Sequence, residues 1–347
     1  AALNQCEACD LREAALAGAD LSRGALAGVD LRQADLQLAN LSHALLPQAR
    51  LGKANMSGAD LSHALLREAD LRNAILAGAA MGFADLTYAE LSNADLTGAR
   101  LTRAEMGRAI MRRSDLTGAN MGKIEAIDAD LSGSTMIGVN LTRANLRKAF
   151  IGEADLTRAH MTEAVLSRAD LAGAVMVGAN LEQASLRSSF LNDVDFSQAN
   201  LVDADLSNAD LNGAVLHQTE ARGANFARSV FSSASLTAAD LSGADLAGAQ
   251  ADAADFTGAV LVSAVLTKAD LGGAILSGAD LSGASLRQAN LRGANLARAN
   301  LTGAVLRKAN LSDADLSGAT LEGADLTGAI LCATAMPWGE ENGGCSE

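Results

Sequence analysis

A five-residue repeat runs through nearly the whole chain without an insertion or a deletion. In steps of five from Leu11 to Leu331 there are 65 positions, and all but three hold Leu, Met, Phe or Ile. The exceptions are Ala126, Ala221 and Ala251. Two residues before each of these central positions, 54 of 65 residues are Ala, and Asp or Asn usually stands between the two. A repeat this regular constrains the fold more than any other property of the chain.

A period of five fits neither regular secondary structure. On an α-helix, five residues advance about 140° around the axis, so the leucines would spread over the whole surface. On a flat strand, an odd step would put successive leucines on opposite faces. Both apolar positions can point inward only if the chain turns a corner once per repeat. Gly, Ser and Asn at the outward positions suit such corners.

The repeat resembles the consensus Ala-(Asp/Asn)-Leu-X-X of the pentapeptide-repeat family, as in Ala19-Asp20-Leu21. The resemblance covers residues 9–333. It implies an all-β fold, a right-handed quadrilateral β-helix (a solenoid) with four pentapeptides, or about 20 residues, in each coil.

The glycines support this coil length independently. In the column of positions 20 apart that contains Gly18 and Gly58, Gly fills the last repeat position in 10 of 16 units, and it is rarer in the other three columns. One face is therefore distinct, as a true coil period requires. The repeat region would then form roughly 16 coils and a rod on the order of 80 Å long.

The four cysteines lie in pairs near the two ends, Cys6 with Cys9 and Cys332 with Cys345. An even count placed where a rod has exposed ends indicates disulfides and an oxidising compartment. A metal site is the alternative, but two cysteines without a nearby histidine are half of a zinc ligand set. The chain begins Ala1-Ala2 without methionine, the start expected of a mature exported protein.

The segments 1–8 and 334–347, which flank the repeat domain 9–333, are expected to cap its open ends. Their sequences resemble those of exported pentapeptide-repeat proteins, which begin with Cys-x-x-Cys-Asp-Leu and end with Cys…Met-Pro-x-Gly…Gly-Cys. This resemblance implies disulfides Cys6–Cys9 and Cys332–Cys345, and a bacterial periplasmic or extracellular location.

Composition argues against several classes of function. A formal net charge of −14 disfavours general nucleic-acid binding. No apolar run approaches the roughly 18–20 residues of a membrane span. Because Ala and Leu fill the interior and polar residues point outward, catalytic groups have no concave site in which to converge. We therefore predict no enzymatic activity, no cofactor and no resident metal.

One surface column is basic or aromatic over seven coils, which is unusual for so acidic a chain. This aromatic–basic column consists of Arg23, His43, His63, Phe83, Arg103, Lys123 and Arg143, and Tyr88 lies one repeat further round. It is the first candidate for docking a partner or an anionic group. His43 and His63 alone are a weak candidate for a metal site or a pH-sensitive pair.

A second candidate surface consists of apolar residues at outward Asp/Asn positions in every second coil of one column. Its members are Ile110, Phe150, Phe190 and Val230, and Leu45 and Leu65 form a shorter apolar pair elsewhere. Exposed apolar strips often mark protein interfaces. The alternative is that neighbouring side chains cover them.

These features predict a non-enzymatic structural or scaffolding protein that binds protein partners, including a larger envelope assembly, along flat β-helix faces. The open ends are also compatible with end-to-end or side-to-side association of copies. The alternative function is that of the fluoroquinolone-resistance members of the family, which resemble duplex DNA and bind type II topoisomerases. This sequence shows neither their carboxy-terminal helix nor their loop insertions.

Overall fold

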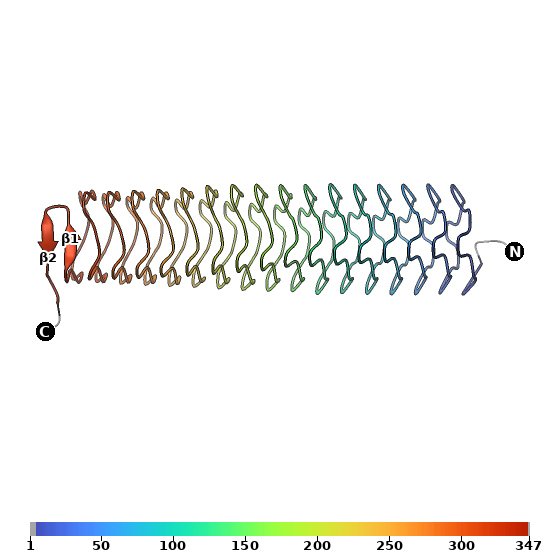
Figure 1. Cartoon of the computed structure of the whole chain (residues 1–347), viewed down its shortest axis with the longest axis horizontal. Coiled ribbons are helices and arrows are strands. Elements are labelled where there is room, and N and C mark those ends of the chain that lie inside the picture. Colours follow the sequence, from blue (N-terminus) through green and yellow to red (C-terminus); the bar gives the residue numbers. More distant parts are fainter. Residues whose placement is uncertain (1–4, 346–347) are drawn as a thin grey trace. The chain divides into compact units, whose positions relative to one another are not determined.

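The computed structural model describes residues 5–345. The chain divides into two compact units, Ala1–Val175 and Met176–Glu347, which are built in the same way (Figure 1). In each, outward residues form parallel β-bridges to residues 20 positions further on, such as Asp10↔Asp30 in the first unit and Asn180↔Asn200 in the second. A coil therefore contains 20 residues. The expected β-helix is confirmed, whereas its handedness and the count of roughly 16 coils stay predictions.

Within each unit, backbone hydrogen bonds join each coil to the next. The N–H of Leu21 donates to the carbonyl of Asn40 at 2.7 Å, and the N–H of Asn40 donates to the carbonyl of Ala19 at 2.9 Å. The pattern recurs through both units. A single coil leaves these groups unpaired, so the stability of each unit comes largely from contacts between neighbouring coils.

A tight turn forms each corner. The carbonyl of Leu21 accepts a hydrogen bond from the N–H of Gly24 at 3.1 Å, and Arg23 between them has a φ of 55°. A positive φ at the third turn residue is the type II geometry, which favours glycine. Many corners nevertheless hold larger residues, with φ between 52° and 62°. Each of these costs roughly 1 kcal/mol, which the hydrogen bonds between coils offset.

The small and the central positions of the repeat form the core. From Leu21 to Leu316, no central residue is more than 1% exposed. Where serine replaces the inward alanine, its hydroxyl donates to the carbonyl three residues earlier at 2.5–2.7 Å, as at Ser114, Ser134, Ser189 and Ser229. The buried hydroxyls therefore keep a hydrogen-bond partner, which avoids the cost of an unpaired polar group.

Large and small residues exchange places where the repeat departs from its consensus. Ala126 occupies a leucine position, while Ile124 fills the preceding alanine position, and both side chains are fully buried. In the second unit, buried Phe226 follows Ala221, and buried Phe256 follows Ala251. Such exchanges keep the core volume nearly constant, which packed interiors require.

The carboxy-terminal segment folds back on the last coil of the second unit. Strands β1 (Thr334–Met336) and β2 (Gly339–Glu341) form an antiparallel hairpin (Figure 1). β1 continues the stacking through the bridge Asp315↔Ala335, and the N–H of Leu331 donates to the carbonyl of Gly343 at 2.6 Å. The hairpin lies in the segment 334–347, whose role as a cap stays a prediction.

Both predicted disulfides, Cys6–Cys9 and Cys332–Cys345, are formed. No cysteine of residues 5–345 is free, so none is available as a thiolate ligand for a metal. Bridge pairing starts at Gln5, inside the segment 1–8. Within the described range there is no helix that could cross a membrane.

Candidate functional site

Three rings of the aromatic–basic column stack in parallel on the first unit. The ring centroids of His43 and His63 are 4.7 Å apart, and those of His63 and Phe83 are 4.9 Å apart. The ring planes differ by only 3° and 4°. Each residue is the third residue of its turn, with φ of 57–59°, so successive coils present these side chains in the same orientation. The expected column is therefore a continuous stack at these positions.

Cationic side chains continue the stack. The Arg103 guanidinium carbon lies 5.5 Å from the Phe83 ring centroid, a distance at which a cation is attracted to an aromatic face. Arg103 and Lys123 are exposed, and neither forms an ion pair within residues 5–345. Arg143 donates two hydrogen bonds of 2.8 Å to Glu163, which lower the pKa of that carboxyl group. The uncompensated charge of the column within the described residues therefore lies at Arg23, Arg103 and Lys123.

Tyr88 lies between two arginines. Its hydroxyl accepts a hydrogen bond from Nη1 of Arg108 at 2.9 Å, and the guanidinium carbons of Arg67 and Arg108 are 5.5 and 5.7 Å from its ring centroid. Sequence reasoning found Tyr88 but missed both arginines. The 20-residue spacing to Arg108 could have revealed one of them, whereas Arg67 reaches the ring from a different position in the repeat.

The pair Leu45 and Leu65 borders the stacked rings. The two residues are bridge partners, each is 44% exposed, and they lie two positions after His43 and His63. Near the other end of the stack is a surface depression of about 440 Å³, lined by Phe83, Thr102, Arg103, Asn120, Gly122, Lys123, Asn140 and Thr142. Apolar, aromatic, polar and cationic groups thus share one region of the first unit.

The second candidate column is interrupted by carboxylates. In the first unit, Phe150 is 50% exposed and Ile110 is half-buried, with Asp130 bridged to both. In the second unit, Phe190 is 54% exposed and Val230 is half-buried, with Asp210 bridged to both. Each apolar residue is therefore separated from the next in its own unit by one charged coil. Neither pair forms a continuous apolar strip.

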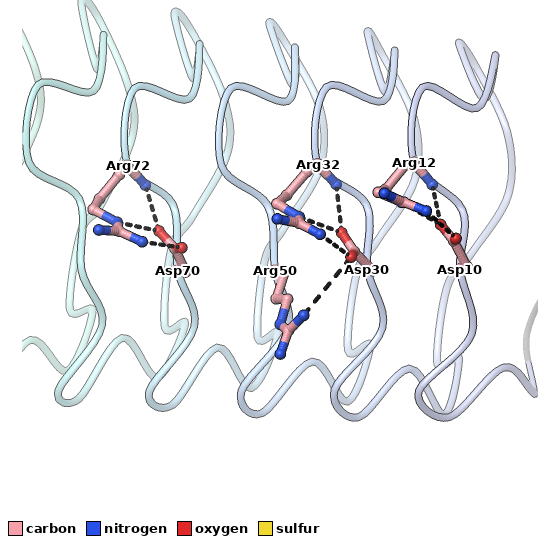
Figure 2. Close-up of polar contacts among 7 residues, drawn as sticks. All are labelled: Asp10, Arg12, Asp30, Arg32, Arg50, Asp70 and Arg72. Carbon is pink, nitrogen blue, oxygen red and sulfur yellow. Dashed lines mark hydrogen bonds and ion pairs between the residues drawn. The ribbon is translucent and has the colours of Figure 1, made fainter.

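A row of Asp–Arg pairs in the amino-terminal part of this same bridge column was not predicted from the sequence (Figure 2). Its members are Asp10–Arg12, Asp30–Arg32 and Asp70–Arg72, and each guanidinium donates two hydrogen bonds of 2.6–2.9 Å to its carboxylate. The hydrogen bonds from Arg12 lower the pKa of Asp10 to about 2. The recurring Asp-Leu-Arg triplet was the signal in the sequence.

Potential metal ligands are dispersed over the described residues. Among them, no group of three or more His, Cys, Asp or Glu side chains is placed to hold a metal ion. The His43–His63 pair therefore has no third ligand of these types in position. The chemistry that this surface offers is stacking, ion pairing and hydrogen bonding with a partner.

A family model described as "Pentapeptide repeats (8 copies)" matches residues 9–124, 127–248 and 254–331 in a series of overlapping or adjacent segments. The chain belongs to the pentapeptide-repeat family. The five-residue period is thus a property that this pentapeptide-repeat protein has in common with its relatives. No curated protein matches the chain.

Several solved pentapeptide-repeat structures are similar to the chain. HetL, involved in heterocyst differentiation regulation in the cyanobacterium Nostoc, is 32% identical over 62% of this chain and 91% of its own, with a TM-score of 0.29. A protein of the Arabidopsis thaliana thylakoid lumen is 40% identical over 26% and 64%, with a TM-score of 0.26. QnrB1, a plasmid-mediated fluoroquinolone resistance protein, is 19% identical over 59% and 91%, with a TM-score of 0.37. Since all three TM-scores are low, the family assignment rests on the repeat model.

Proposed function

We propose that this pentapeptide-repeat protein is a non-enzymatic scaffold that binds a protein partner through the aromatic–basic column of the first unit. The observation that carries the proposal is the exposed stack from His43 through His63 and Phe83 to Arg103. Aromatic residues and arginine dominate the binding energy of many protein interfaces. Because the corner backbone fixes the stack, little conformational entropy would be lost on binding.

The chemistry of the column favours an acidic partner surface. Stacking covers the faces of the inner rings and leaves their edges open, and aromatic edges carry partial positive charge. Arg103 and Lys123 add full positive charges. Leu45 and Leu65 supply apolar area beside these groups, so the surface has the apolar centre and charged rim typical of interfaces.

We also propose that the protein acts outside the cytoplasm, in the bacterial periplasm or beyond the cell. The two disulfides support this location because they persist in oxidising compartments. Mimicry of DNA toward a type II topoisomerase is the alternative, and the net charge of −14 is its main support.

Replacing Arg103 by Glu is expected to reduce partner capture about tenfold or more, because it reverses the charge next to Phe83. The measurement uses a photo-crosslinking amino acid at position 83, introduced in the native host, and quantifies the adduct with and without Arg103→Glu. Arg113→Glu is the matched control, because Arg113 is an exposed corner residue two repeats away in the chain.

The proposal requires that the adduct formed at position 83 is absent when the crosslinker stands at position 113. It also requires that Arg113→Glu leaves the adduct formed at position 83 unchanged. Equal adducts from both positions, or equal losses with both charge reversals, would show that the aromatic–basic column is not the docking surface.

A further inference from the structure

At Arg50, the row of Asp–Arg pairs lacks the internal hydrogen bond that its other members make. In many repeats the side chain of the outward Asp or Asn accepts a hydrogen bond from the backbone N–H two residues later. Examples are Arg32 to Asp30 at 3.3 Å and Arg72 to Asp70 at 3.1 Å. At the coil between these two, Arg50 replaces the aspartate. The N–H of Gly52 therefore has no hydrogen-bond acceptor among residues 5–345.

Cationic groups surround this free N–H. The guanidiniums of Arg32 and Arg72 bind their own aspartates through Nε and Nη2, which leaves Nη1 of each unbonded. Figure 2 shows these two pairs on either side of the coil that carries Arg50. Lys53, next to Gly52, is exposed and forms no ion pair in the described part of the chain.

The local charges do not balance. Three cationic side chains and one carboxylate line a surface depression at Gly52, namely Arg32, Lys53 and Arg72 with Asp70. Arg50 and Asp30 lie beside it and add one charge of each sign. Arg50 makes only a long contact of 3.9 Å from its Nη1 to Asp30. The region therefore has an excess of two positive charges beside an unpaired backbone donor.

The space for a ligand is present as well. Gly52 has no side chain, and a surface depression of about 300 Å³ lies over it, lined by Arg32, Gln33, Gly52, Lys53, Asp70, Arg72 and Asn73. Amide side chains at its rim add further hydrogen-bond donors. A Cβ placed at Gly52 would meet nothing closer than the carbonyl oxygen of Arg72 at 3.6 Å, with Oδ1 of Asp70 at 3.9 Å.

We propose that this depression binds a phosphate dianion, free or as a monoester, whose oxygen takes the place of the aspartate carboxylate that the repeat lacks at position 50. Phosphate carries about −1.5 to −2 charges at pH 7, which matches the excess of cations. Its oxygens can accept hydrogen bonds from a guanidinium, an ammonium and a backbone N–H at the same time. A carboxylate, with one charge, leaves one cation unmatched. The site is independent of the proposed docking function, because Lys53 stands two repeats away in the chain from His43 and His63.

The test is an NMR titration of the full chain with inorganic phosphate at constant ionic strength, following the Gly52 amide. We expect a saturable shift at Gly52, and an affinity about tenfold weaker in Arg50→Asp, which restores the repeat's own carboxylate. Arg158→Asp makes the same charge change at an exposed corner of the first unit and is expected to leave the affinity unchanged.

Titrations with two further ligands, O-phosphoserine and acetate, compare free phosphate with a phosphate monoester and with a carboxylate. Equal affinity for O-phosphoserine assigns the site to the phosphate group itself, and tighter binding assigns it to a monoester. Acetate that binds as tightly as phosphate, no saturable shift at Gly52, or an unchanged affinity in Arg50→Asp would overturn the proposal.

Discussion

Replacing Ala126 by Leu is expected to destabilise the first unit by about 1–3 kcal/mol, because the added atoms meet Ile124 in a filled core. Replacing Ile124 by Ala is expected to cost about 2–5 kcal/mol through the cavity that it leaves. The double variant, which restores the consensus sizes at both positions, is expected to recover most of both losses. The reason is that both side chains are fully buried and consecutive on the inward face.

Urea unfolding of the wild type, both single variants and the double variant measures this coupling as a double-mutant cycle. Leu46→Ala combined with Ala126→Leu is the control, since Leu46 is a buried central residue of the same unit, four coils earlier in the repeat. Distant pairs are additive within about 0.5 kcal/mol. If the Ile124/Ala126 pair were equally additive, the two residues would not share one core volume.

Removing the disulfide Cys332–Cys345 by a double serine substitution is expected to destabilise the carboxy-terminal cap by about 3 kcal/mol. The bond closes a loop of sequence separation 13 that contains the β1–β2 hairpin. Without it, the tail is held mainly by β1 and by the bond from Leu331 to Gly343. The coil beneath would then lose protection, because the N–H of Leu316 donates to the carbonyl of Ala335.

Hydrogen exchange followed by mass spectrometry measures this loss at residues 311–336. The matched control removes Cys6–Cys9, which has a sequence separation of only 3 and is expected to have a smaller effect. Unchanged protection of residues 311–336 after the loss of Cys332–Cys345 would show that the cap is held without its disulfide.

The sequence predicted the features that depend on the backbone period alone. The five-residue pattern placed Ala and Leu inside, and the 20-residue spacing put His43, His63 and Phe83 in one column. The structure adds that their rings are parallel, because identical corner geometry repeats in successive coils. The disulfide pairing was also predicted, from the resemblance of the two end segments to exported relatives.

Features that depend on the reach of long side chains were not predicted. Arg67 contacts the Tyr88 ring from a different position in its repeat, so no fixed spacing in the sequence predicts the contact. The lack of an acceptor for the N–H of Gly52 can be recognised only once the hydrogen bonds of the neighbouring coils are known. The hairpin of β1 and β2 lies outside the repeat, and its antiparallel pairing has no counterpart in the five-residue pattern.

The central claim is that residues 20 apart are direct neighbours on adjacent coils, since every surface site described depends on it. Cysteines placed at Leu45 and Leu65 test it directly, because bridged strands are about 4.8 Å apart and disulfides form across about 4.4–6.8 Å between Cα atoms. Under mild oxidation, we expect the Leu45→Cys/Leu65→Cys pair to crosslink nearly completely. The Leu45→Cys/Asp85→Cys pair, two coils apart, is expected not to crosslink. Efficient crosslinking of the second pair, or failure of the first, would contradict the 20-residue coil.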